Sequence, residues 1–145
     1  NLEIPIDLKK IAFGLKLKIK PLEFDKDLSG MLVNHTIYVN QEMHPNRQRF
    51  TIAHELGHYL IHKKNQNSYK GIRFRSEYIS TQEKKEEREA NQFASLLLMP
   101  QNFLENDLKG SKDLSEEDIS KWAKKYQVSS IAMTIRLEKI GYCFS

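Results

Sequence analysis

The sequence predicts an α+β fold that is mostly helical, with a small antiparallel sheet or hairpin before a long central helix and a helical pair at the carboxy-terminal end. Three observations lead to this prediction. The length of 145 residues suits one domain with a buried core. Two stretches before residue 40 have the apolar pattern of strands. Several later segments repeat apolar residues every three or four positions, which is typical of helices.

Composition and charge exclude several classes of protein. No apolar run approaches the roughly 20 residues of a membrane span, and the first residues lack the basic and then apolar pattern of a signal peptide. Cys143 is the only cysteine, which excludes an internal disulfide and a cysteine-based zinc site. The net charge of +4 comes from lysines interleaved with acids, so nucleic-acid binding is allowed but not required. We expect a cytoplasmic protein with no membrane partner.

The first part of the chain predicts a short helix followed by strands. Apolar residues between positions 6 and 13 indicate the helix, and residues 15–20 alternate between apolar side chains and lysine until Pro21 ends that strand. Residues 29–40 form two apolar runs around Asn34 and His35, a pair suited to a tight turn. We therefore expect a β-hairpin directly before the central helix.

One edge of this hairpin could bind a substrate. An extended peptide can add a strand to an open sheet edge through main-chain hydrogen bonds. A loop of the chain could instead cover the same edge. The residues of the predicted substrate-binding edge strand are Gly30, Met31, Leu32 and Val33.

The middle of the chain predicts two long helices joined by a polar stretch. Pro45 begins the first helix, since proline suits the first helical turn. Residues 63–80 are polar, with only residues 72–74 typical of a strand, and are expected to form a lid over the site or a disordered connection. A capping box at residues 80–83 opens the second helix, which Pro100 stops.

The last part of the chain predicts shorter helices, at residues 101–108, 116–126 and 131–140. Serines precede the last two as capping residues, and Gly141 closes the final helix. We expect residues 1–108 to form the core and residues 109–145 to form a helical extension packed on it, in a single compact unit.

The motif that carries chemistry is His-Glu-Leu-Gly-His at residues 54–58 of the central helix. His54 and His58 are four residues apart, which puts both imidazoles on one face, about 5–6 Å apart between Cβ atoms, within reach of one metal ion. Glu55 lies beside that ion and could take a proton from a water molecule that the metal polarises. Without a metal these buried polar groups would need other partners. We therefore predict a zinc-hydrolase site with one Zn²⁺ per chain.

A catalytic zinc site needs a third protein ligand. Glu87 and Asn91 share one face of the second long helix, so Glu87 could bind the metal while Asn91 accepts a hydrogen bond from a ligating histidine. His62 lies about 80° round the central helix from His54 and is expected near the helix end instead. The alternative donors are Glu89, Glu86, His35 and His44.

Two long motifs in this order resemble the ImmA/IrrE family of metallo-endopeptidases. The first is RQRFTIAHELGHYL at residues 47–60, and the second is EREANQFASLLLMP at residues 87–100. Ser29–Gly30 followed by the strand at residues 37–40 is similar to the hairpin of that family. The resemblance covers about residues 5–105.

The resemblance implies a zincin-like fold and a gluzincin-like zinc peptidase, with His54, His58 and Glu87 as ligands and Glu55 as catalytic base. Members of the family act inside bacteria, often from phage or mobile elements, and cleave a helix-turn-helix repressor. A protein substrate of that kind is therefore implied here. The donor to the oxyanion stays open among Tyr59, Tyr78 and His35.

The carboxy-terminal segment at residues 119–137 suggests an alternative function, because it resembles a helix-turn-helix. Under this hypothesis the protein is a DNA-binding or protein-docking regulator with a structural or inactive metal site. The basic residues available for phosphates are Lys121, Lys124, Lys125 and Arg136. Their number is low, and Ile131, Ile135 and Leu137 have the character of core residues. We therefore expect this helical pair to pack on the core or to dock a substrate.

Overall fold

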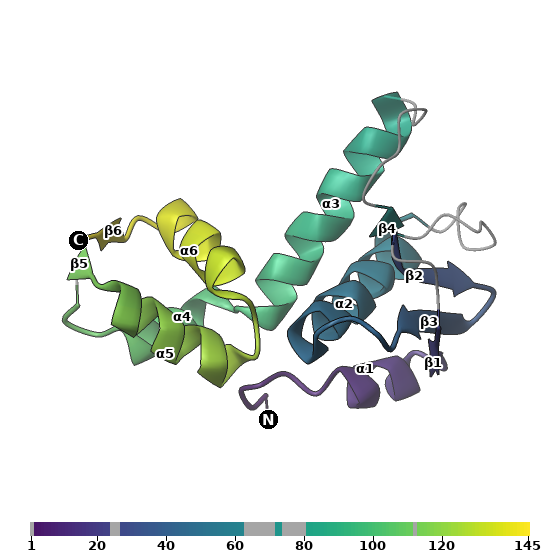
Figure 1. Ribbon diagram of the computed structural model, residues 1–145, viewed down its shortest axis with the longest axis horizontal. Coiled ribbons are helices and arrows are strands. Elements are labelled where there is room, and N and C mark those ends of the chain that lie inside the picture. Colours follow the sequence, from purple (N-terminus) through teal and green to yellow (C-terminus); the bar gives the residue numbers. More distant parts are fainter. Residues whose placement is uncertain (1, 24–26, 63–71, 74–80, 112) are drawn as a thin grey trace. The chain divides into compact units, whose positions relative to one another are not determined.

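The computed structural model describes residues 2–23, 27–62, 72–73, 81–111 and 113–145 (Figure 1). In these ranges the chain is α+β and mostly helical, as the sequence predicts. No helix in the described part of the chain is both long enough and apolar enough to cross a membrane. The chain divides into two compact units, Asp7–Ala94 and the combination of Asn1–Ile6 with Ser95–Ser145. The predicted core boundary at residue 108 stays a prediction.

The unit Asp7–Ala94 begins with helix α1 (Leu8–Gly14), close to its predicted position. The Asp7 side chain caps the helix by accepting a hydrogen bond from the Lys10 amide at 3.0 Å, because the first amides of a helix have no partner within it. Leu8 and Ala12 bury the inner face of α1.

A four-stranded sheet follows, in the order β1-β3-β2-β4. Its strands are β1 (Lys18–Leu22), β2 (Leu28–Val33), β3 (Thr36–Asn40) and β4 (Ile72–Arg73). The predicted hairpin is confirmed: β2 and β3 pair antiparallel, and Asn34 in their turn has a left-handed φ of 54°. The sheet as a whole is mixed, because β1 runs parallel to β3. The pairing of β4 with β2 confirms the strand expected near residue 72.

The prediction that Pro21 ends the first strand is wrong. Pro21 lies inside β1, where it is in register with Val39 of β3. Because β1 is an edge strand, the missing amide hydrogen of proline leaves no partner strand without a donor.

Helix α2 (Pro45–Ile61) covers one face of the sheet and contacts both β2 and β3 (Figure 1). Pro45 occupies its first turn as predicted, and the Nδ1 atom of His44 caps it by accepting a hydrogen bond from the Asn46 amide at 3.0 Å. The helix buries residues 51 and 53–57, so most of the His-Glu-Leu-Gly-His motif lies inside the unit.

The approach of α2 to β2 depends on Gly30. A Cβ atom at this position would lie 2.5 Å from Thr51 Cγ2 and 2.5 Å from the Tyr38 carbonyl oxygen. Next to it, the Ser29 hydroxyl accepts hydrogen bonds from the Arg47 guanidinium at 3.3 and 3.4 Å. These contacts hold the start of α2 on the sheet, so they also set where the helix carries its histidines.

Helix α3 (Thr81–Leu98) ends before Pro100, as predicted. Its first 14 residues belong to the unit Asp7–Ala94 and its last four to the other unit. The Ser80 cap and the lid expected from residues 63–80 lie outside the described residues, apart from β4.

The second unit contains three helices and a short two-stranded parallel sheet in its described residues. These elements are α4 (Gln101–Asp107), β5 (Asp113–Leu114), α5 (Glu116–Tyr126), α6 (Ser130–Lys139) and β6 (Cys143–Phe144). The predicted serine caps are present: Ser115 forms a capping box with Asp118, and Ser129 accepts a hydrogen bond from the Ala132 amide. Gly141, with φ of 99°, closes α6 as predicted.

Two predictions for α6 need correction. Met133 and Leu137 form its buried face, while Ile131 and Ile135 are 74% and 47% exposed. The two pairs lie about 200° apart around the helix, so they cannot share one face. Arg136, expected at the surface for phosphates, is buried and donates from Nε to the Met99 carbonyl at 2.9 Å.

We predict that Gly30→Ala lowers the free energy of unfolding by about 1–3 kcal/mol, because the added methyl overpacks a contact with backbone that cannot yield. Gly14→Ala is the matched control, since no atom lies within 4 Å of its added Cβ and alanine favours the end of α1. Chemical denaturation followed by circular dichroism measures both. Equal stability of the two variants would contradict the close packing of α2 on β2.

Candidate metal centre

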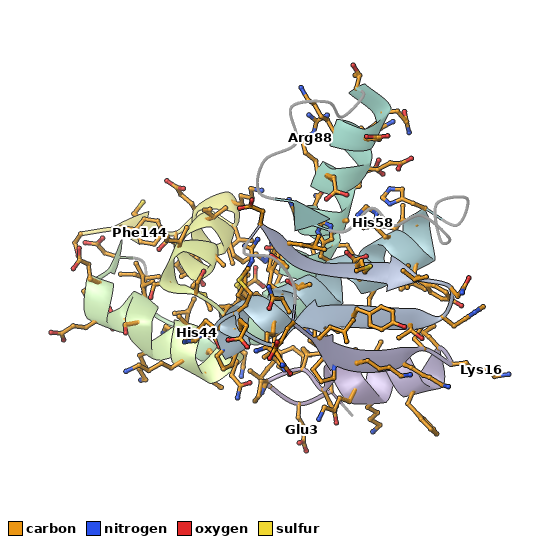
Figure 2. All side chains as sticks on the ribbon, turned by 45° about the vertical axis from the view of Figure 1, so that its right-hand side comes forward. Glu3, Lys16, His44, His58, Arg88 and Phe144 are labelled. Carbon is orange, nitrogen blue, oxygen red and sulfur yellow. The ribbon has the colours of Figure 1, made fainter. Side chains whose placement is uncertain are left out.

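The two motif histidines turn their side chains to the same point. The Nε2 atoms of His54 and His58 lie 3.0 Å apart, as expected for residues one helical turn apart. His54 is fully buried, and His58 lies toward α3 (Figure 2). Both imidazoles therefore present a nitrogen to one small volume between the two helices.

Glu87 of α3 completes the cluster from the opposite side. Its Oε2 atom is 3.0 Å from His54 Nε2, and its Oε1 atom is 2.8 Å from His58 Nε2. One ligand atom from each of these three residues lies within 4.8 Å of the others, and within the described part of the chain this is the group that could hold a metal ion. The structure thus brings together the three predicted ligands.

The alternative acids on α3 lie elsewhere. Glu86 is buried and accepts a hydrogen bond from Gln82 at 3.3 Å. Glu89 approaches His62, with 3.8 Å between Oε1 and Nε2. Neither residue belongs to the group of His54, His58 and Glu87 that could hold a metal ion. His35 instead contacts Tyr59 edge-on, and His44 caps α2.

The close approach of α2 and α3 depends on Gly57, between the two histidines. A Cβ atom there would lie 3.0–3.2 Å from side-chain atoms of Phe93. Ala90 and Ala94 of α3 are fully buried small residues. Small side chains on both helices therefore let Glu87 reach the histidines.

Asn91 defines the proton positions on His54. The Nδ1 atom of His54 is 2.7 Å from the Asn91 amide oxygen, which can only accept a hydrogen bond. A neutral His54 therefore carries its proton on Nδ1, and its Nε2 lone pair faces the Glu87 carboxylate. A lone pair opposite an anion is unfavourable unless a proton or a metal ion lies between them, so this arrangement suits a metal ligand.

Electrostatics at the cluster follow from burial and from these contacts. Burial lowers the pKa of His54, and this outweighs the opposing effect of Glu87. Burial by itself would raise the pKa of Glu87, but the two adjacent histidines lower it to about 2. A neutral His54 and an ionised Glu87 are the protonation states that metal ligands require.

The carboxyl group of Glu55 is fully buried, in surroundings that are unfavourable for its charged form. Neither of its carboxylate oxygens has a hydrogen-bond partner among the residues that the structure describes. Burial and, after it, the charge of Glu87 raise the pKa of Glu55 well above the ordinary value of 4.5. A buried carboxyl without a partner is costly, and a polarised water molecule beside the cluster would supply one.

The predicted edge strand is in part paired. Gly30 of β2 is in register with Ile72 of β4, so the chain itself occupies this part of the edge. The pairing described for β4 does not extend to Met31, Leu32 or Val33. Tyr78, one of the open choices for an oxyanion donor, lies outside the described residues.

Sequence reasoning missed the contact of His62 with the cluster. His62 caps the end of α2, as expected, but its Nδ1 atom is also 3.0 Å from the Nδ1 atom of His58. The available signal was its spacing of four residues from His58, which puts the two side chains on one helix face.

The chain is similar to known proteins in both sequence and fold. Residues 12–138 match the sequence profile of a peptidase family described as the IrrE N-terminal-like domain. Metallopeptidase ImmA of Bacillus subtilis is 32% identical over 107 residues, which are 74% of this chain and 57% of that protein. A transcriptional regulator of Mycobacterium tuberculosis has a similar fold, with a TM-score of 0.62 and 16% identity over 90% of this chain and 39% of that one. This chain therefore spans little more than half of its curated relative.

We predict that Glu55→Gln changes how the stability of the zinc-free protein depends on pH. Because its pKa is raised, folded Glu55 keeps a proton that the unfolded chain loses above about pH 4.5. The free energy of unfolding of wild type therefore falls as pH rises from about 4.5 toward the raised pKa. Glutamine does not titrate. The unfolding free energy of the variant relative to wild type should therefore increase from pH 5 to pH 8, by at most about 1.4 kcal/mol per pH unit.

Denaturant titrations of both chelator-treated proteins across this range measure the effect. A difference between the two proteins that stays constant with pH would show that the environment of Glu55 leaves its pKa unchanged.

Proposed function

The chain belongs to the family of the IrrE N-terminal-like domain, and from this premise we propose that it is a zinc-dependent endopeptidase that hydrolyses peptide bonds in a protein substrate. One observation carries the proposal. His54, His58 and Glu87 converge within 4.8 Å beside the buried carboxyl of Glu55, which has no partner among the described residues. Three donors next to a general base are the requirements of a hydrolytic metal site.

The donor set favours zinc. Two imidazole nitrogens and one carboxylate oxygen are a common ligand set of catalytic Zn²⁺, which leaves a coordination position for water or substrate. Bound zinc supplies Lewis acidity, which activates water and polarises a peptide carbonyl. His54, His58 and Glu87 would hold the ion, and Asn91 would keep the ring of His54 in place through the hydrogen bond at Nδ1.

Glu55 performs the proton transfers in this proposal. Its carboxylate lies buried beside the metal-binding cluster and has no hydrogen-bond partner among the described residues, so it can accept the proton of the attacking water. It then holds that proton on a carboxyl oxygen and delivers it to the nitrogen of the leaving amine. Burial of the side chain excludes bulk water, which would otherwise compete for the proton.

The proposed substrate is a protein with an extended cleavage segment, and the resemblance noted in the sequence suggests a helix-turn-helix repressor. Met31, Leu32 and Val33 of β2 are the backbone that we propose pairs with that segment. Extended peptides fit such an edge through alternating main-chain hydrogen bonds.

The structure offers less support for DNA binding by α5 and α6. Arg136 is buried against the Met99 carbonyl, and Lys125 binds Asp107 with 2.8 Å between Nζ and Oδ1. Two of the four basic side chains offered for phosphates are thus engaged within their own unit. Arg136 is thereby removed from the exterior, where a duplex-binding surface needs its charges.

We predict that the purified protein contains about one zinc ion per chain and that Glu87→Ala loses most of it, because two histidines alone bind zinc weakly. Glu89→Ala is the matched comparison from the same helix and should lose much less zinc, because Glu89 contacts His62 and lies outside the group that could hold the ion. Elemental analysis after purification without chelator measures both. Zinc loss in Glu89→Ala with retention in Glu87→Ala would assign the third ligand to the other acid.

We predict that Glu55→Gln keeps its zinc but loses peptidase activity by about 10²–10⁴-fold, because glutamine cannot accept the proton. Gel electrophoresis and mass spectrometry of candidate repressors incubated with the protein would measure cleavage. An unchanged cleavage rate in this variant would exclude Glu55 as the base. Absence of cleavage by the zinc-loaded wild type across helix-turn-helix repressors and unfolded proteins would contradict the proposed activity.

A further inference from the structure

His62 is a buried histidine that the proposed mechanism does not use. Its side chain is 6% exposed and lies one turn beyond His58, at the carboxy-terminal cap of α2. The two rings are tilted by 52° with centroids 5.0 Å apart, and their Nδ1 atoms are 3.0 Å apart. His62 therefore touches His58 at the ring nitrogen that faces away from the metal-binding cluster.

The hydrogen bond between these two Nδ1 atoms needs one proton, and the cluster determines which ring supplies it. The Nε2 atom of His58 is the one that faces His54 and Glu87. To offer a lone pair there, a neutral His58 must carry its proton on Nδ1. His58 then donates the hydrogen bond, and His62 Nδ1 accepts it.

The far side of His62 favours the same assignment. With Nδ1 as acceptor, a neutral His62 carries its proton on Nε2. That nitrogen is buried and lies 3.8 Å from the Glu89 Oε1 atom, with no hydrogen-bond partner among the described residues. The Nε2–H group is attracted to the carboxylate, whereas the opposite tautomer would direct a lone pair at it.

We propose that His62 is a positioning residue of the metal centre, which fixes the tautomer and ring orientation of His58 by accepting its Nδ1–H, with Glu89 holding His62 in the complementary tautomer. This rests on the zinc site of the proposed function. The two histidine ligands are then oriented by different groups, His54 by the amide of Asn91 and His58 by an imidazole. Hydrogen-bond partners of this kind raise the basicity of a ligand and hold its ring in place.

Zinc affinity of three proteins tests the proposal. His62→Phe keeps a ring of similar size but has no acceptor, and should weaken zinc binding about 10–100-fold. His62→Asn puts a carbonyl oxygen near the position of Nδ1 and should restore the affinity to within a few-fold of wild type. Competition with a chromophoric chelator measures the dissociation constants, and thermal unfolding of the zinc-free proteins monitors folding.

The outcomes separate this inference from the proposed function. If wild type binds no zinc, the metal site itself fails, and the role of His62 fails with it. If wild type binds zinc and His62→Phe binds it equally well, only the inference is overturned. Equal weakening in His62→Phe and His62→Asn also overturns it, since that result assigns His62 a packing role.

A second measurement does not depend on the folding of a variant. In zinc-loaded wild type, two-bond ¹H–¹⁵N correlations of the histidine rings should show His62 protonated on Nε2 and unprotonated on Nδ1. A proton on His62 Nδ1 would overturn the proposal.

Discussion

The close contact between α2 and α3 is the constraint on which the site depends. A Cβ atom at Gly57 would lie only 3.0–3.2 Å from Phe93, and Ala90 and Ala94 keep the facing surface of α3 small. Because the helices meet so closely, the carboxylate of Glu87 reaches both imidazoles at about hydrogen-bond distance. Larger residues at these positions would separate the donors by more than the reach of one ion.

This contact also buries polar groups that a simple core would not contain. His54 and Glu55 are fully buried, and the residues on either side of them in α2, Ala53 and Leu56, belong to the apolar core. Removing such groups from water is unfavourable unless each finds a partner. His54 has Asn91 and Glu87 as partners, whereas Glu55 has none among the described residues. The cost of removal from water therefore falls mainly on Glu55, the group to which we assign proton transfer.

Much of the site was predictable because it depends on local spacing. The four-residue spacing of His54 and His58 fixes their common face, and the same spacing relates Glu87 to Asn91 on α3. The pairing of two helices far apart in the sequence is set by tertiary packing, and sequence reasoning reached Glu87 only with Glu89 and Glu86 as alternatives. The predictions that Pro21 ends the first strand and that Ile131 is a core residue were wrong for the same reason. Strand order and the inward face of a helix depend on neighbours that local patterns do not specify.

Two carboxyl groups in one cluster acquire opposite properties from their surroundings. The two imidazoles beside Glu87 lower its pKa to about 2 despite burial, so it stays ionised as a ligand must. Glu55 has no hydrogen-bond partner among the described residues, and burial together with the charge of Glu87 raises its pKa. The charge of Glu87 thus contributes to the state of Glu55, because an ionised Glu87 favours a proton on Glu55. Groups whose pKa values are moved apart in this way are suited to separate roles, one as a permanent anion and one as a proton carrier.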